Sequence, residues 1–585
     1  MEQGTKCNAA TPSHRLETAR ACADLLIRQG MFARAKTILE AAVHLLPRLA
    51  PRHLKHTDAQ FNISQFVNLT NRAVSLSLET MDDSYRALQL LEVGRGILAS
   101  LQLEIRSDIS VLAANHPELA HQFQELRNQI DSPSSTLERT MIQDQSGRVT
   151  ANSSRVISNR RTLLNQFDDL IVHIRSQHGF ENFLQGPSKS ELLLLAEQGP
   201  IVVFNVSDIR SDSFLITTAD ICCVRLPSLS LDSVKHFAKV NMGKVKQRKL
   251  NPTESDVQSG AKGIPPGGDA DINAKRKAML ISNEAPSNEM RTILKWLWDC
   301  AVNPVLKELG LTETPENEHW PHVWWITSGL LSRFPIHAAG DHVNGSNANA
   351  MDRVISSYVP TLKSLAYSRE KGKIQFDNAE ASTALLVAMP TTPSQSALPC
   401  AEKEVKEVGA LIANRITKTI VLQPSKSEVL NSLAGCHVVH FACHGESNPD
   451  DPSKSRLLLQ DWKDDPLSVA DITPLNLGNA AFAYLSACSA ADSQVESLLD
   501  EGIHLAGAFQ LAGFQSVVGT LWHISDEHSA KVAVDVYREL FKKSGRIHPE
   551  GVARALHLAV RKLRSEMEGK FEDSLFWSPY IHMDI

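Results

Sequence analysis

Two short segments of the sequence carry side chains suited to covalent catalysis. HVVHFACHGE, residues 437–446, contains Cys443, His444 and Gly445, and YLSACSA, residues 484–490, contains Cys488. Each reactive group follows an apolar run of the kind that forms a buried strand. A thiol beside an imidazole can lose its proton and become a strong nucleophile. His444 and Cys488 are therefore the candidate catalytic pair.

The two strands that precede these residues must be neighbours if the pair is to meet. In an open parallel sheet, functional groups gather at the carboxyl ends of the strands, so His444 and Cys488 are expected to lie close together. Gly445 permits close approach of the backbone. Its N–H and that of Cys488 are the predicted oxyanion hole. The order of histidine before cysteine, each after a strand, favours a caspase-like hydrolase.

The same residues allow other interpretations. A single cysteine in an apolar strand is usually inert, and a single histidine is more often a hydrogen-bonded core residue. Metal ligation is the competing interpretation, because five possible ligands crowd one segment: Cys436, His437, His440, Cys443 and His444. Alternate residues of a strand face opposite ways, however, and no CxxC pair completes a tetrahedral site. We therefore predict no metal and no cofactor.

The strands belong to a longer α/β pattern that begins near residue 290. Apolar runs at 322–327, 384–388, 437–443, 481–486 and 516–522 alternate with helical segments. This pattern predicts a mainly parallel sheet that helices cover on both faces. A hairpin formed by residues 200–206 and 213–217 is expected ahead of it.

The first 130 residues have a different, helical pattern. Small and apolar residues recur at helical spacing around Ala23, Leu26, Ala35, Leu39 and Ala42. The pattern resembles a tetratricopeptide (TPR) hairpin, and a weaker second unit follows. A plain helical bundle is the alternative.

The expected domain order follows from these patterns. An all-α TPR-like helical domain at residues 1–130 precedes a linker and helix at 131–180. Residues 181–585 form the α/β domain, with a disordered insertion at 241–290.

Composition narrows the function classes further. The chain of 585 residues has a net charge of -6, which favours neither nucleic acid nor an anionic membrane. The basic cluster between Lys235 and Lys249 is interpreted as a solvated face or as a site for an acidic partner. No apolar stretch could span a bilayer, and residues 1–17 lack the apolar core of a signal peptide. The nine cysteines are therefore expected to be reduced, in a cytoplasmic protein.

Together, the motifs around His444 and Cys488 resemble those of CHAT domains, which are caspase-like peptidases associated with TPR arrays. Further segments resemble the family as well: 334–340, 398–405, 501–522 and 576–580 in the α/β region, and 45–52 and 91–96 in the helical region.

This resemblance implies a function and roles for individual residues. His444 would be the general base or imidazolium partner, and Cys488 the nucleophile that is acylated during peptide hydrolysis through a thioester. Ser486 would line the substrate pocket. The resemblance also implies a protein substrate, regulated limited proteolysis, and a protein partner or activator at the helical region. The alternative is a non-catalytic interaction scaffold with a degenerate caspase-like fold.

Charged residues near the pair suggest a cleavage preference. Glu446, Asp492, Asp500 and Glu501 are acidic, and residues 481–521 contain no lysine or arginine. An Asp-selective pocket needs cations. The sequence therefore predicts that the residue before the scissile bond is not Asp but a basic or a neutral unbranched residue.

Overall fold

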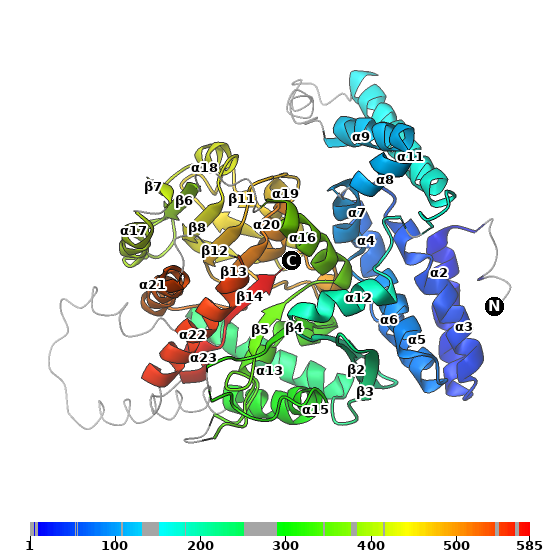
Figure 1. Ribbon diagram of the computed structural model, residues 1–585, viewed down its shortest axis with the longest axis horizontal. Helices are drawn as coiled ribbons and strands as arrows, with labels where there is room; N and C mark the ends of the chain where they lie inside the picture. The colour runs from blue at the N-terminus through cyan, green and yellow to red at the C-terminus, as the bar shows by residue number, and fades with distance from the viewer. Residues whose placement is uncertain are drawn as a thin grey trace.

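The computed structural model describes most of the chain. The described residues are 5, 10–52, 54, 56–106, 109–131, 151–181, 183–250, 289–316, 318–342, 346–375, 383–413, 416–543, 549–567 and 573–584. They form an N-terminal helical region packed against a single large mixed sheet with its own helices (Figure 1). The class expected from the sequence, helical region followed by α/β domain, is confirmed.

Helical hairpins build the first part of the helical region. Its helices are α2 (Pro12–Arg28), α3 (Phe32–Val43), α4 (His56–Ser64), α5 (Leu69–Glu79), α6 (Ser84–Val93) and α7 (Ile97–Arg106). Thr11 caps the start of α2, and Gly30, at a φ of +71°, makes the turn into α3. Small residues such as Ala23 and Ala35, both fully buried, let α2 and α3 approach closely. The hairpin expected around Gly30 is therefore present.

A smaller helical arm follows, with a core of its own. It comprises α8 (Ser110–Asn115), α9 (Pro117–Asp131) and α11 (Ala151–Arg175), and it projects from one end of the helical region (Figure 1). Phe123 and Phe167 lie at the centre of its core, with ring centroids 4.8 Å apart. The arm is thus held together by contacts separate from those of the main core.

Eleven strands form the large sheet. They are β1 (Ile201–Val206), β2 (Ser211–Ile216), β3 (Ile221–Arg225), β4 (His322–Ile326), β5 (Ile355–Tyr358), β6 (Thr383–Ala388), β7 (Thr417–Leu422), β8 (Val438–Ala442), β12 (Phe482–Ser486), β13 (Ser516–Thr520) and β14 (Tyr580–Asp584). Their spatial order is β3-β2-β1-β4-β5-β14-β13-β12-β8-β6-β7. A second, three-stranded sheet contains β9 (His444–Glu446), β10 (Arg456–Leu458) and β11 (Leu467–Ser468).

Strand direction divides the large sheet into two parallel groups. β13, β12, β8, β6 and β7 run parallel to one another, and so do β1, β4, β5 and β14. The groups meet at the antiparallel pair β13–β14, and the β1–β2–β3 meander ends the sheet. The predicted hairpin corresponds to β1 and β2.

Helices cover both faces of the sheet. The helices outside the N-terminal region are α12 (Lys189–Leu195), α13 (Leu231–Leu250), α15 (Asn303–Glu308), α16 (Leu362–Gln375), α17 (Ala401–Ile412), α18 (Lys426–Leu433), α19 (Val469–Ile472), α20 (Leu505–Ala512), α21 (Asp526–Lys543), α22 (Pro549–Met567) and α23 (Asp573–Trp577). α17, α21 and α22 contact each other in series and pack on the strands. α20 packs on β13 and also contacts α7, which places the helical region against this part of the α/β domain.

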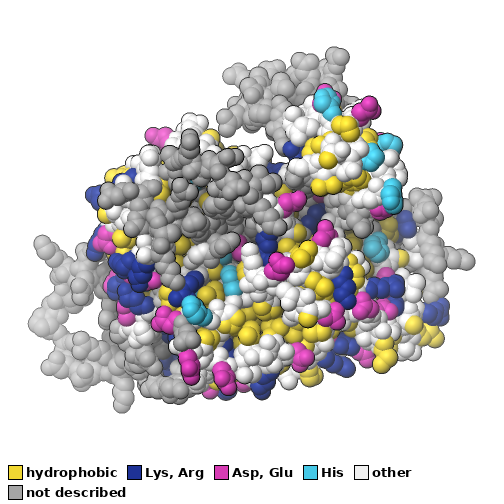
Figure 2. Space-filling model, in the orientation of Figure 1, with side chains coloured by type: hydrophobic (Ala, Val, Ile, Leu, Met, Phe, Trp, Pro, Cys, Tyr) yellow, Lys and Arg dark blue, Asp and Glu magenta, His cyan; other side chains and the backbone are white. Residues whose placement is uncertain are grey.

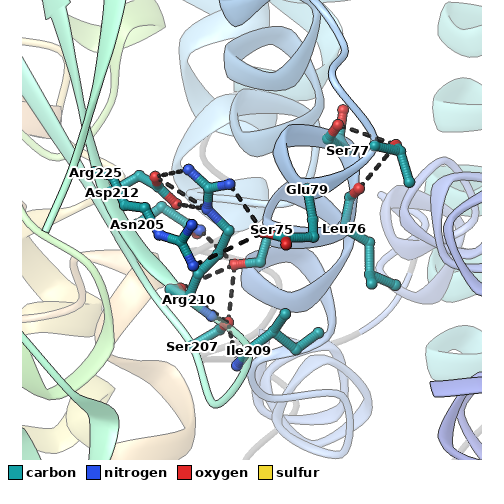
Figure 3. Close-up of polar contacts among 11 residues, drawn as sticks. Ser75, Leu76, Ser77, Glu79, Asn205, Ser207, Ile209, Arg210, Asp212 and Arg225 are labelled. Carbon is teal, nitrogen blue, oxygen red and sulfur yellow. Dashed lines mark hydrogen bonds and ion pairs between the residues drawn. The ribbon is translucent and has the colours of Figure 1, made fainter. Parts of the chain in front are cut away.

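A polar junction fixes α5 to the meander end of the sheet (Figure 3). The hydroxyl of Ser75 lies 2.8 Å from that of Ser207 and also accepts from the amide of Asn205. Arg210 bridges the fully buried Asp212 and Glu79 at the end of α5. Because buried polar groups must keep their partners, these bonds set how the helices sit on the sheet.

Boundaries differ from the sequence expectation in two places. The insertion predicted at 241–290 begins inside α13, which continues to Leu250, and residues 251–288 lie outside the described residues. The linker predicted from residue 131 covers 132–150, also outside them, but 151–160 belong to α11. The helix expected within residues 131–180 thus begins at Ala151.

Candidate active site

The candidate pair lies at the carboxyl ends of two adjacent parallel strands. β8 and β12 pair in register from Val438–Phe482 to Ala442–Ser486, and the N–H of Cys443 then donates to the carbonyl of Ser486 at 3.3 Å. His444 is the next residue after Cys443, and Cys488 lies two residues beyond β12. Both side chains are half-buried. The topology predicted from the sequence therefore brings the two segments together.

Gly445 is in contact with the cysteine loop. A Cβ atom at this position would lie 2.4 Å from the carbonyl oxygen of Cys488 and 3.3 Å from the Cβ of Ala487. No L side chain fits at such a distance from backbone atoms. The glycine is thus needed for the close approach of the two chain segments, as the sequence suggested.

The imidazole of His444 has a defined tautomer. Its Nε2 lies 2.9 Å from the carbonyl oxygen of Ser396, in the segment that joins β6 to α17. Because a carbonyl can only accept, Nε2 carries the proton, and in the neutral ring Nδ1 is the unprotonated nitrogen. The ring is therefore held in a form with a free basic nitrogen.

The turn that carries Cys488 is held by main-chain and hydroxyl contacts. Ser489 has a φ of +54°, a left-handed conformation that costs energy for a residue with a side chain. Its N–H donates to the carbonyl of Trp522, and the hydroxyl of Thr520 donates to the carbonyl of Ala487 at 2.7 Å. The hydroxyl of Ser447 donates to the carbonyl of Ser489. Flanking strands thus fix the backbone on both sides of Cys488.

Ser486 has a structural partner. Its side chain is buried, and its hydroxyl is hydrogen-bonded to that of Ser529 in α21. This bond links β12 to the helix that covers it. A role of Ser486 in substrate binding stays a prediction.

The remaining histidines and cysteines of the HVVHFACHGE segment contact different neighbours. His440 is fully buried, and its Nε2 lies 3.0 Å from Oε1 of Glu404 in α17. His437 accepts from the N–H of Thr383. Burial raises the pKa of the Cys443 thiol well above its ordinary value, so this thiol stays protonated. In the described part of the chain, no three His, Cys, Asp or Glu side chains are arranged to hold a metal ion.

Three of the four acids that suggested a cleavage preference have partners of their own. Glu446 forms an ion pair with Arg456 at 2.8 Å. Asp500 accepts from the N–H of Gly329, and Glu501 accepts from the N–H of Leu98. These contacts give Glu446, Asp500 and Glu501 structural roles, so these three acids no longer support a pocket for basic residues. The preference stays a prediction.

Sequence reasoning missed the contribution of Ser396. The group that bonds His444 is a main-chain carbonyl, which every residue possesses, so residue type gives no signal for it. Glu404 and His440 both lie in segments whose sequences resemble the family, 398–405 and 437–446. Their pairing could not be read from a single sequence.

Comparisons with known proteins agree with this architecture. Two crystal structures of the Saccharomyces cerevisiae separase-securin complex contain a chain that is similar in fold, with TM-scores of 0.55 and 0.54 at 12% and 11% identity. The first match covers 98% of this chain and 40% of the matched chain in that complex. The Arg-specific cysteine proteinase gingipain R matches with a TM-score of 0.33 at 11% identity, over 49% of this chain and 68% of its own. No curated protein sequence matches the chain.

The family of the chain follows from its α/β region. Within the described residues, no helix combines the length and the apolar character needed to cross a membrane. The CHAT domain family matches residues 291–584, half of the chain, and this match includes both reactive segments. The α/β region has a caspase-like fold. The chain belongs to the CHAT domain family.

Proposed function

We propose that this protein is a cysteine endopeptidase that performs regulated, limited proteolysis of a protein substrate with His444 and Cys488. The observation that carries the proposal is the hydrogen bond from Nε2 of His444 to the carbonyl of Ser396. It leaves Nδ1 as the basic nitrogen of the ring, and the next residue, Gly445, is in contact with the backbone of Cys488. A basic nitrogen next to a thiol is the arrangement that activates a cysteine nucleophile. Membership of the CHAT domain family supports the same function.

The proposed reaction proceeds through a thioester. Nδ1 of His444 takes the proton of the Cys488 thiol, and the thiolate attacks the scissile carbonyl carbon. The N–H groups of Gly445 and Cys488 stabilise the oxyanion of the tetrahedral intermediate. The intermediate collapses, the imidazolium gives its proton to the leaving amine, and the acyl group stays on Cys488. Water, activated by His444, then hydrolyses the thioester.

We infer that regulation acts through the TPR-like helical region, as a site for a protein partner or activator. The separase-securin neighbour is itself a complex of two proteins, which supports a protein partner. On the face that Figure 2 shows, Lys and Arg side chains are interspersed with Asp and Glu, which does not favour a nucleic-acid partner. We also propose that the protein acts in the reducing environment of the cytoplasm, where a catalytic thiol stays reduced.

Labelling with an electrophilic thiol probe tests the catalytic pair. Wild-type protein should label rapidly at Cys488, and Cys488→Ala should lose this label. His444→Ala should slow labelling at Cys488 at least tenfold, because general-base assistance contributes about 100-fold or more in hydrolases. Melting temperatures should stay close to wild type in both variants, since both side chains are half-buried.

The chain offers matched controls for this experiment. Cys443 and Cys436 are buried thiols of the same segment, so Cys443→Ala and Cys436→Ala should leave labelling of Cys488 intact. Cys222 is exposed and reports background reactivity. Equal loss in all four variants of the reactive segments would point to a folding defect. Labelling of Cys488 that is slow and independent of His444 would favour the non-catalytic scaffold.

A further inference from the structure

The carbonyl that bonds His444 belongs to a segment with no helix or strand of its own. Residues 389–400 join β6 to α17, and the side chain of Ser396 is exposed. Ser394, two residues before it, has a φ of +63°, a left-handed conformation that is unfavourable for a residue with a side chain. Such a conformation persists only where contacts from the surrounding structure hold it. The position of the Ser396 carbonyl therefore depends on those contacts.

Trp462, in the turn after β10, supplies one of these contacts. Its side chain is half-buried, and the indole Nε1–H donates to the carbonyl of Pro393 at 2.9 Å. The next residue, Lys463, donates from Nζ to the hydroxyl of Ser394. Two consecutive residues of one turn thus hold the part of the segment that leads to the Ser396 carbonyl.

The same turn is tied to the other side of His444. β10 pairs antiparallel with β9, and Leu458 lies opposite His444 in this pair. Arg456, at the start of β10, forms an ion pair with Glu446 at 2.8 Å, and its guanidinium carbon lies 5.0 Å from the centre of the Trp462 ring. A cation stacked on an indole is a favourable contact. Trp462 is therefore linked both to the strand that begins at His444 and to the segment that accepts the hydrogen bond of its imidazole.

We propose that Trp462 is a positioning residue for His444. By fixing Pro393, it holds the Ser396 carbonyl where the Nε2–H form of the imidazole donates to it. A neutral ring can carry its proton on either nitrogen, and a fixed acceptor beside Nε2 selects one tautomer. Nδ1 then stays unprotonated and available as a base. This inference rests on the proposed function, in which Nδ1 takes the proton of the Cys488 thiol.

The rate at which an electrophilic thiol probe labels Cys488 tests this role. Trp462→Phe removes the indole N–H but keeps an aromatic ring under Arg456. It should slow labelling about fivefold, the change that loss of one neutral hydrogen bond makes in an equilibrium. If the melting temperature of Trp462→Phe falls, Lys463→Met takes its place, because it removes the neighbouring bond at an exposed position.

A second background separates positioning from a general effect on the fold. In His444→Ala, whose labelling is already slow, adding Trp462→Phe should change the rate by less than about twofold, because the residue through which Trp462 acts is absent. An equal loss in both backgrounds would mean that Trp462 supports the fold and not the imidazole, and would overturn the proposal. So would labelling of Trp462→Phe at the wild-type rate.

Nitrogen NMR of the full chain with isotope-labelled histidine tests the inference even if Cys488 proves unreactive. The signals of His444 are those that His444→Ala lacks. In the wild type, the two ring nitrogens should have widely separated shifts, as a single tautomer gives. In Trp462→Phe, at a pH where the ring is neutral, the two shifts should move toward each other as both tautomers are sampled. An unchanged separation would overturn the proposal, whether or not the protein is a peptidase.

Trp320→Phe is the matched control. The indole Nε1–H of Trp320 also donates to a main-chain carbonyl, that of Asp352 at 3.2 Å, and its ring also lies under a guanidinium, that of Arg561 at 4.8 Å. Trp320 precedes β4, which is five positions away from β8 in the sheet. The same chemical change at this distance should leave the labelling of Cys488 unchanged. An equal loss in the control would assign the effect to the fold as a whole and overturn the proposal.

Discussion

The carboxylate of Glu501 accepts a hydrogen bond from the backbone N–H of Leu98 at 2.8 Å, although 403 residues separate them in the chain. Leu98 is in the first turn of α7, where N–H groups lack helical partners and a carboxylate is favoured. The adjacent Asp500 accepts from the N–H of Gly96 through its main-chain carbonyl. The segment that follows Cys488 is thus attached directly to the start of a helix in the N-terminal region.

This attachment predicts a pH-dependent contribution to stability. Burial raises the pKa of Glu501 from its ordinary value to about 7, with Asp500 adding to the effect and the N–H groups of Leu98 and Ile97 opposing it. The folded protein therefore binds this proton more tightly than the unfolded chain. The contribution is fully present below pH 4.5 and is lost as the pH rises through 7. At about 1.4 kcal/mol per unit, the loss is on the order of 3 kcal/mol.

Glu501→Gln isolates the effect, because its amide oxygen can still accept from Leu98. We expect the urea unfolding midpoint of the variant, relative to that of the wild type, to increase from pH 5 through 6 and 7 to 8. The measurement must compare variant with wild type at each pH, because other groups also change the stability with pH. Buried histidines with lowered pKa values, such as His504 and His582, reduce the stability of both proteins as the pH falls. Glu496→Gln, an exposed neighbour, should show no trend. A pH-independent difference for Glu501→Gln would contradict the assignment.

Gly445→Ala should disrupt the meeting of the two reactive segments. The added methyl would lie 2.4 Å from the carbonyl oxygen of Cys488, so either strand end must shift. Misplacement of about 1 Å at a catalytic group can cost about 100-fold in rate, and we expect a loss of that order in labelling of Cys488. Gly435→Ala is the control, since a Cβ there meets no atom within 4 Å. Comparable labelling of the two alanine variants would refute this role of Gly445.

The sequence was most informative where local pattern and chemistry coincide. Val438 and Val439 precede His444 in an apolar run, so both the strand and the reactive group that follows it were predictable. The place of β14 was not, because it pairs antiparallel with β13 and parallel with β5, and both contacts are distant in sequence. β7 was not predicted; it is an edge strand in which no residue is fully buried, so it differs from the buried apolar runs that mark the inner strands.

The reactive residues of the candidate site were predictable from the sequence, but their hydrogen-bond partners were not. Residue type indicated His444 and Cys488, but the acceptor for His444 is a main-chain carbonyl and leaves no mark in composition. The acids Asp500 and Glu501 were interpreted as neighbours of the site, whereas their partners lie in segments that only the folded chain brings near. Long-range hydrogen bonds of this kind cannot be derived from spacing along one sequence.

Replacing residues 255–284 by a short Gly/Ser linker should leave the melting temperature within about 2 °C of the wild type. The stretch is rich in Gly, Pro, Lys and Asp, and such a composition buries little apolar area. Phe214→Ala, at a fully buried position of β2, is the positive control and should lower the melting temperature clearly. Loss of soluble expression on replacement would show that the stretch stabilises the fold.

The contact between Glu404 and His440 should be among the most sensitive in the α/β domain. His440 is fully buried, Glu404 is 2% exposed, and their side chains join α17 to β8, the strand that leads to His444. Glu404→Ala leaves the imidazole without its partner in an apolar setting, where Nδ1 already has none among the described residues. Breaking a buried contact of this kind costs about 3 kcal/mol, which should appear as a large drop in the urea midpoint. Glu404→Gln keeps an acceptor oxygen and should lose less stability.

On the same helix, Glu402 forms an exposed ion pair with Lys406, so Glu402→Ala should change stability by less than about 1 kcal/mol. If Glu404→Ala proves as stable as Glu402→Ala, the buried contact does not hold α17 to the strand. Labelling of Cys488 gives a second measurement. If labelling is slower in Glu404→Ala and returns to the wild-type rate in Glu404→Gln, the Glu404–His440 contact also helps to position His444.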